Sequence, residues 1–225
     1  MPIFRYATIF FLAAAIVACA SSGRGGPGER RGPVGVNQPS ALLAKARDIQ
    51  AKQGCAKAAP TYRIVSSYGE GYEIAQYELG ACLLEIEGGS VTETALFRDE
   101  GLFWLKRAAW AGNPRAQLKL AEILSGEPGS AVSHISADPA RAMVWSIVYD
   151  QNGARETYGL KPVGPIVAGH LRAVLSAEMM DAARGDAARF QQISMDEFVP
   201  LAQDRDERAQ SQERGRRSEG RRRQR

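Results

Sequence analysis

The feature that most constrains this chain is a pattern that occurs twice at a fixed spacing. Five markers recur with a single offset of 41 residues: Gln76 and Gln117, Leu79 and Leu120, Leu83 and Leu124, Trp104 and Trp145, and Gly112 and Gly153. A period of this length is typical of repeat architectures, in which each copy is one supersecondary unit. The sequence therefore predicts two tandem units, at about residues 72–112 and 113–153.

Apolar residues inside the first unit recur at helical spacing. Two rows are present, one formed by Ala75, Leu79 and Leu83 and the other by Leu102, Leu105 and Ala109. This spacing is the signature of amphipathic helices. The run Gly112-Asn113-Pro114 separates the units. Because Gly commonly ends a helix and Pro suits the first turn of the next, we expect an all-α fold with two helices per unit.

The same residues resemble the Sel-one-like repeat family, a branch of the tetratricopeptide-repeat superfamily. Units of that family have an Ala-Gln-x-x-Leu-Gly opening, a Gly-rich loop, an acidic residue before an Ala-x-x-Trp helix, a Lys-x-Ala-Ala segment and a Gly-Asn end. The first unit agrees at Ala75, Gln76, Leu79, Gly80, Gly88, Gly89, Asp99, Trp104, Lys106, Ala108, Ala109, Gly112 and Asn113. The second agrees at Ala116, Gln117, Leu120, Gly126, Asp138, Ala142, Trp145 and Gly153.

The chain departs from the family pattern at three places. Ala121 replaces the opening Gly, Gly101 stands where Ala is expected, and Val148-Tyr149 replaces the Lys-Ala-Ala segment. Both units are longer than usual, and we expect the surplus in loops at residues 88–98 and 125–136. The resemblance implies an α-solenoid of stacked antiparallel helix pairs, which presents a groove for protein partners.

The N-terminus has the pattern of an export signal. Arg5 precedes an apolar stretch of signal-peptide length, which ends in Ile16-Val17-Ala18-Cys19. This ending resembles the cleavage box of bacterial lipoproteins, so residues 1–18 are predicted to be removed and Cys19 to be lipidated. The alternative is a plain secretory signal, cut after Ala18 or Ala20. Since no Asp follows Cys19, we expect a lipid anchor in the outer membrane of a Gram-negative bacterium, with the protein facing the periplasm.

The remaining segments are predicted from composition and helical pattern. Residues 19–39 are rich in Gly and Pro and form a predicted flexible tether to a helical repeat domain at residues 40–200. Within that domain we expect a short helix at 41–53 capped by Ser40, a weak echo of a repeat helix at 60–68, and capping helices at about 166–192 with Ser176 at a helix start.

The C-terminal residues 201–225 are arginine-rich. They hold nine Arg and five acidic residues, so their net charge, 9 − 5 = +4, equals that of the whole chain. A block of this kind is either a solvated, disordered tail or an electrostatic arm that binds an anionic envelope polymer. Because the rest of the chain sums to zero, we expect no nucleic-acid partner.

Two cysteines remain after Cys19. Cys55 and Cys82 form an even pair in a predicted exported domain, which favours a disulfide. The alternative is two buried free thiols in separate helices. A zinc site that joins them to His134 and His170 would need spacings unlike those of known short-range ligand pairs.

No motif for catalysis or cofactor binding occurs in the sequence. Neither histidine lies near a recognised nucleophile, and neighbouring acidic pairs such as Asp99-Glu100 diverge on a helix. The three tryptophans, at 104, 110 and 145, lie at positions typical of helix packing, and we expect Trp104 and Trp145 to have equivalent environments. We therefore predict that the protein is not an enzyme and carries no cofactor.

A binding groove is the remaining candidate site. Tyr77 and Glu85 share one row of the first unit with Ala81, and Leu118 and Glu122 share a row of the second. These four positions are predicted to bind a periplasmic protein or peptide and to be largely exposed. Two functions stay open: an interaction module that uses this groove, or a structural envelope lipoprotein that uses its arginine-rich tail.

Overall fold

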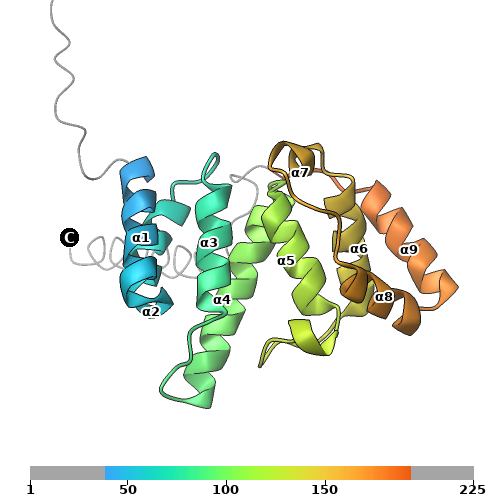
Figure 1. Cartoon of the computed structure of the whole chain (residues 1–225), viewed down its shortest axis with the longest axis horizontal. Coiled ribbons are helices and arrows are strands. Elements are labelled where there is room, and N and C mark those ends of the chain that lie inside the picture. Colours follow the sequence, from blue (N-terminus) through green and yellow to red (C-terminus); the bar gives the residue numbers. More distant parts are fainter. Residues whose placement is uncertain (1–38, 194–225) are drawn as a thin grey trace, which may run out of the picture. The chain divides into compact units, whose positions relative to one another are not determined.

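The computed structural model describes residues 39–193, and every regular element in that range is helical (Figure 1). The elements are α1 (Pro39–Gln53), α2 (Cys55–Ser66), α3 (Glu73–Leu83), α4 (Val91–Trp110), α5 (Pro114–Leu124), the 3-10 turn η1 (Pro128–Ser130), α6 (Pro139–Asp150), α7 (Gly153–Thr157), α8 (Pro165–Val174) and α9 (Ala177–Ala188). The predicted signal peptide, most of the tether and the arginine-rich tail lie outside the described residues. The all-α prediction is confirmed for the described part.

Packing follows the order of the chain. From α1 to α6 each helix packs against the next one, and α6 then contacts both α8 and α9. Helices α3 and α5, which open the two predicted units, also touch each other. The predicted units therefore correspond to the pairs α3–α4 and α5–α6, placed side by side (Figure 1).

The junction between the two units explains the Gly-Asn-Pro run. Gly112 has φ of 90°, and the N–H groups of Gly112 and Asn113 donate to the carbonyls of Ala109 and Ala108 at 3.0 and 2.9 Å. This is the Schellman arrangement that closes a helix C-terminus. Asn113 Oδ1 then accepts from the N–H of Ala116 at 3.1 Å, which caps α5. Three consecutive residues thus end one helix and begin the next.

Close packing between α3 and α4 explains why Gly101 departs from the family pattern. A Cβ atom added at Gly101 would lie 2.9 Å from the carbonyl oxygen of Gly80, and one added at Gly80 would lie 2.9 Å from that of Gly101. Contacts under 3.0 Å with backbone atoms cannot be relieved by turning a side chain. The two helices therefore cross with backbone against backbone, and this crossing requires glycine on both sides.

Helix α4 corrects one prediction. Residues 88–98 were expected to form a loop, but the helix begins at Val91. Ser90 Oγ accepts from the N–H of Glu93 at 3.1 Å, while Glu93 Oε2 accepts from the N–H of Gly89 at 2.7 Å. This reciprocal pair is a variant of the capping box, and Ser90 and Glu93 have the spacing of that motif. The loop is therefore short, and α4 gains two turns at its N-terminal end.

The ends of the domain also differ from expectation. Helix α1 already includes Pro39 and Ser40, so Ser40 lies within the helix and does not cap it. Helix α2 runs from Cys55 to Ser66, earlier than the predicted 60–68. Helix α7 was not expected; Asn152 Oδ1 accepts from the N–H of Ala154 at 2.9 Å and starts it. At the other end, Ser176 Oγ accepts from the N–H of Met179 at 3.3 Å and caps α9.

Two apolar clusters form the core. The first involves α1 to α4 and contains Tyr62, Leu79 and Leu83 together with both cysteines. The second extends from Leu105 on α4 through α5, α6 and α8 to Ala187 on α9. Within the described part of the chain, no helix combines the length and the apolar character needed to cross a membrane.

Candidate functional site

The repeated glutamine has the same role in both units. Gln76 Nε2 donates to the carbonyl of Ser66 at 3.1 Å, and Gln117 Nε2 donates to the carbonyl of Ala109 at 3.0 Å. Both side chains are fully buried, and each acceptor lies at the C-terminal end of the preceding helix. The glutamine therefore ties the last turn of the preceding helix to the helix that follows; at Ala109 it adds to the bond from the Gly112 N–H. These residues build the scaffold on which the candidate face lies.

The predicted binding residues lie on α3, on α5 and just after α3. Tyr77 and Leu118 are half-buried at the edge of the second apolar cluster, and Glu122 is half-buried as well. Glu85 is exposed. The expectation that all four are largely exposed is therefore wrong for three of them, because α3 and α5 pack against each other and partly cover these side chains. We call Tyr77, Leu118 and Glu122 the α3–α5 face.

Burial shapes the electrostatics of this face. Desolvation raises the pKa of Glu122, an effect that Lys119 partly opposes. Desolvation also raises the pKa of Tyr77; Arg115 opposes this rise, whereas Glu122 and, more weakly, Glu85 add to it. Tyr77 therefore lies within electrostatic range of acidic groups in both units. The structure brings Tyr77, on α3, together with Glu122, on α5.

The polar ends of these two side chains have no protein partner in residues 39–193. No hydrogen bond or ion pair there involves the Tyr77 hydroxyl or the Glu122 carboxylate. A half-buried carboxylate has lost part of its hydration and gains nothing in return unless a donor approaches it. The α3–α5 face therefore presents an acceptor and a hydroxyl beside the apolar side chain of Leu118.

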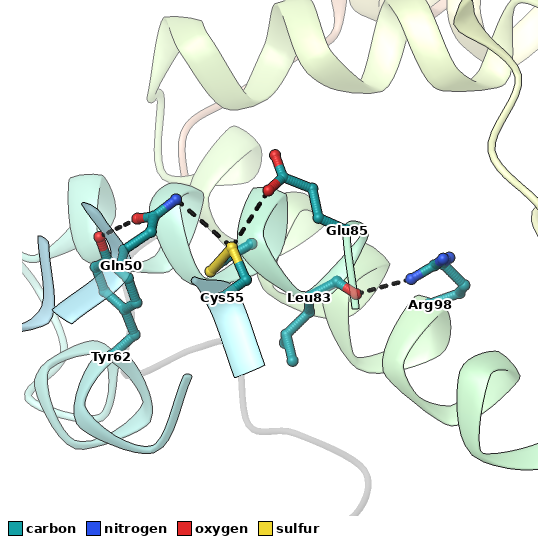
Figure 2. Close-up of a disulfide and its surroundings, with 7 residues drawn as sticks. Gln50, Cys55, Tyr62, Leu83, Glu85 and Arg98 are labelled. Atoms are coloured by element: carbon teal, nitrogen blue, oxygen red, sulfur yellow. Dashed lines mark hydrogen bonds between the residues drawn. A yellow bond between two sulfur atoms is a disulfide. The ribbon is translucent and has the colours of Figure 1, made fainter. Parts of the chain in front are cut away.

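Glu85 belongs to a different site, a disulfide that joins the start of α2 to α3. Cys55 and Cys82 are bonded, with an S–S distance of 2.10 Å. Glu85 Oε2 lies 3.3 Å from Sγ of Cys55, and Gln50 Nε2 lies 3.5 Å from the same sulfur (Figure 2). A disulfide sulfur carries no proton, so the carboxylate contact is not a hydrogen bond. Since both cysteines are used in the bridge, they are not ligands of a zinc site with the two histidines.

The position of Gln50 is fixed by Tyr62. The Tyr62 hydroxyl donates to Gln50 Oε1 at 2.6 Å, which turns the amide nitrogen of Gln50 towards Cys55 (Figure 2). Burial, followed by the neighbouring Glu78 carboxylate, raises the pKa of Tyr62 to about 12. The hydroxyl therefore keeps its proton at neutral pH and continues to donate to Gln50.

Sequence reasoning missed a buried arginine. Arg98 is only 2% exposed, and its Nη1 donates to the Leu83 carbonyl at 3.0 Å (Figure 2). The same Nη1 donates to the Ile86 carbonyl at 2.7 Å. Its Nη2 pairs with Glu87. The guanidinium therefore closes the C-terminal end of α3, where carbonyls lack intrahelical partners. The signal that could have found it is the capping box at Ser90, because a helix that begins there turns Arg98 back towards α3.

The remaining candidates do not assemble into a reactive centre. His134 lies in an exposed loop with φ of 63°, and His170 lies on α8. Between residues 39 and 193, no group of three or more His, Cys, Asp or Glu side chains is placed to hold a metal ion. A cleft of about 610 Å³ lies between α4 and residues 134–140, with Met179 at its edge, and none of the four predicted binding residues lines it.

Comparison with known protein families, with curated proteins and with solved structures gives no match for this chain.

Proposed function

We propose that this protein is a non-catalytic interaction module that binds a protein or peptide partner on the α3–α5 face. The observation that carries this proposal is a pair of half-buried polar groups without a partner among residues 39–193, the Glu122 carboxylate and the Tyr77 hydroxyl. Their burial costs stability in the free protein, and a partner that donates to them removes this cost.

The chemistry of the face indicates the kind of partner. A basic or amide side chain would donate to Glu122, and an apolar side chain beside it would cover Leu118 and the ring of Tyr77. Because two packed helices hold these residues in place, little conformational entropy is lost when a partner binds. The matching roles of Gln76 and Gln117 support a solenoid of the Sel-one-like type, which binds partners in this manner.

The proposed address is the periplasmic face of the outer membrane, with a lipid on Cys19 as the anchor. The support is the Ile16-Val17-Ala18-Cys19 box and the Gly- and Pro-rich segment after it. Two or more acyl chains at one site hold a protein stably at a membrane, whereas one chain does so only marginally. Mass spectrometry of the mature N-terminus tests this address, because an unmodified N-terminus at another residue would contradict it.

A pair of isosteric substitutions tests the binding face. Tyr77→Phe with Glu122→Gln removes a hydroxyl and a charge and leaves the packing volume unchanged. The matched control is Tyr158→Phe with Glu156→Gln, which makes the same changes at exposed positions. Chemical crosslinking and pull-down from native envelopes should recover a partner with the control and the wild type, and lose it with the first variant.

The same experiment also tests the second function that the sequence left open, a structural envelope lipoprotein that uses its arginine-rich tail. A chain truncated after residue 200 lacks the arginine-rich tail and should keep the partner if the α3–α5 face binds it. Loss of the partner in the truncated chain, with full capture by the Tyr77→Phe, Glu122→Gln variant, would overturn the proposal. That result would indicate a structural envelope protein whose tail binds an anionic polymer.

A further inference from the structure

The two cysteines of the disulfide differ in their exposure to solvent. Cys55 is 9% exposed, whereas Cys82 is 0% exposed within the first apolar cluster, beside Leu79 and Leu83. Cys55 is the first residue of α2 and follows Gly54, so this cysteine lies at the end of a helix. Exchange with an external thiol requires the incoming thiolate to touch the sulfur that it attacks. Of the two, Cys55 is therefore the cysteine that an external thiolate approaches more easily, since Cys82 is fully buried.

A negative charge lies beside the reachable sulfur. The Glu85 carboxylate is 3.3 Å from Sγ of Cys55 (Figure 2), and Glu85 is an exposed residue. The species that attacks a disulfide is an anion, the thiolate. An incoming thiolate must therefore approach to within a few ångströms of a fixed carboxylate. Unit charges of the same sign about 4 Å apart in water repel strongly enough to slow a reaction roughly fivefold.

We propose that Cys55 is the site at which this protein undergoes thiol–disulfide exchange, and that Glu85 selects against anionic thiols there. A thiolate attacks Sγ of Cys55 and forms a mixed disulfide, while the bond to Cys82 breaks. The Cys82 sulfur leaves with the electron pair and takes a proton from water. A second thiolate then releases Cys55 as a thiol, so that two reductant thiols are oxidised to one disulfide and both cysteines are reduced.

Gln50 is the second polar side chain that contacts Sγ of Cys55. Its amide nitrogen lies 3.5 Å from Sγ of Cys55, held in that direction by the Tyr62 hydroxyl. An amide N–H at this place, together with the N-terminus of α2, stabilises the thiolate that Cys55 becomes in the second step. Gln50 and the start of α2 thus offset the repulsion that Glu85 exerts on the departing Cys55 thiolate, and Glu85 also opposes the approach of an anionic reductant. This site is separate from the α3–α5 face and does not depend on the proposed function.

Rates of reduction with thiols of different charge test the proposal. The oxidised full-length chain is treated with glutathione, 2-mercaptoethanol or cysteamine, whose thiolate forms are strongly negative, singly negative and electroneutral. Each rate is divided by the rate of the same thiol with a small-molecule disulfide, which removes differences in thiol pKa. The variant is Glu85→Gln, and the matched control is Glu70→Gln, which removes one exposed carboxylate away from the bridge.

We expect wild type and Glu70→Gln to react slowest with glutathione and fastest with cysteamine. Glu85→Gln should react roughly fivefold faster with glutathione and change little with cysteamine. Alkylation during the reaction, followed by peptide mass spectrometry, should find the glutathione adduct on Cys55. An adduct on Cys82, equal rates for Glu85→Gln and Glu70→Gln, or rates independent of thiol concentration would each overturn the proposal. The last result would mean that reduction follows unfolding.

Discussion

The pairs α3–α4 and α5–α6 share their sequence markers but not their surroundings. Each unit uses a buried glutamine to bind the end of the preceding helix. The equivalent tryptophans nevertheless differ. Trp145 is 3% exposed and makes edge contacts with Trp110 and Phe190, at ring-centroid distances of 5.4 and 6.0 Å. Trp104 is half-buried. The prediction that the two have equivalent environments is therefore wrong.

The difference arises from what lies outside the repeat. Phe190 follows α9, stacks on Trp110 at 5.2 Å and covers Trp145, and the Ile193 N–H donates to the carbonyl of Trp110 at 3.1 Å. Trp104 instead donates from Nε1 to Glu100 at 3.3 Å, with the Arg107 guanidinium 5.8 Å from its ring. A repeated residue thus fixes a position on a helix, and the elements packed over that position decide its burial.

Replacing the tryptophans should give the largest effect and tests this difference directly. Trp145→Ala should lower the free energy of unfolding by about 3–5 kcal/mol, since it removes a buried aromatic side chain and its ring contacts. Trp104→Ala should cost about 1–2 kcal/mol, because its side chain already contacts solvent. Urea denaturation of both variants measures the two losses, and equal losses would show that the environments are alike after all.

Removing the disulfide should affect one region and leave the other intact. The bridge closes a loop between Cys55 and Cys82, with a sequence separation of 27 residues, and its loss should cost about 3 kcal/mol on the chain-entropy model. We expect Cys55→Ala with Cys82→Ala to lose amide-exchange protection in α1 and α2 and to keep it in α5 and α6. Hydrogen exchange read by mass spectrometry checks this. A uniform loss along the chain would show that the two clusters unfold as one.

The repeated glutamines allow a like-for-like test of the two units. Gln76→Met and Gln117→Met keep the side-chain length and remove the bond to a buried carbonyl, so each should cost about 1–3 kcal/mol. Gln117→Met also removes the bond that Gln117 Oε1 accepts from Asn152 Nδ2 at 2.8 Å. Thermal or chemical unfolding measures both losses. A negligible loss of unfolding free energy at either position would show that Gln76 and Gln117 do not have the same role.

The sequence predicted the fold class and several element ends because these depend on local chemistry. Helical spacing predicted the helices, and the run from Gly112 to Pro114 marked a junction that the structure builds from the same residues. It also favoured the Cys55–Cys82 pairing that the structure contains. Local signals of this kind act over one or two helical turns, so a single chain displays them.

Features that depend on distant contacts could not be read in this way. Phe190 covers Trp145 from 45 residues further along the chain, and no local pattern links them. The burial of Tyr77 and Glu122 depends on how closely α3 approaches α5. Glu85 lies beside the disulfide, a contact that its helical spacing from Tyr77 and Ala81 did not predict. The capping box at Ser90 and the Asn152 cap of α7 were local signals that went unused.

The smallest expected effect concerns a position at which the two units differ in charge, Ala81 in the first and Glu122 in the second. Burial raises the pKa of Glu122 above its ordinary value of 4.5 in the folded protein. Between the ordinary and the raised value the folded state binds more protons than the unfolded state, so stability falls as pH rises through that window and is level above it. Glu122→Gln removes this loss.

The variant should therefore become more stable relative to wild type as the pH rises from the ordinary pKa of a glutamate through the raised pKa of Glu122 in the folded protein. Urea denaturation at several pH values measures the difference, with Glu70→Gln as the control for removing one exposed charge. A difference that stays constant with pH would show that the carboxylate is not desolvated. A difference that grows with pH would mean that the free protein gives up stability to keep an acid at this position, where the first unit has alanine. That cost is what a carboxylate held ready for a partner's donor would impose.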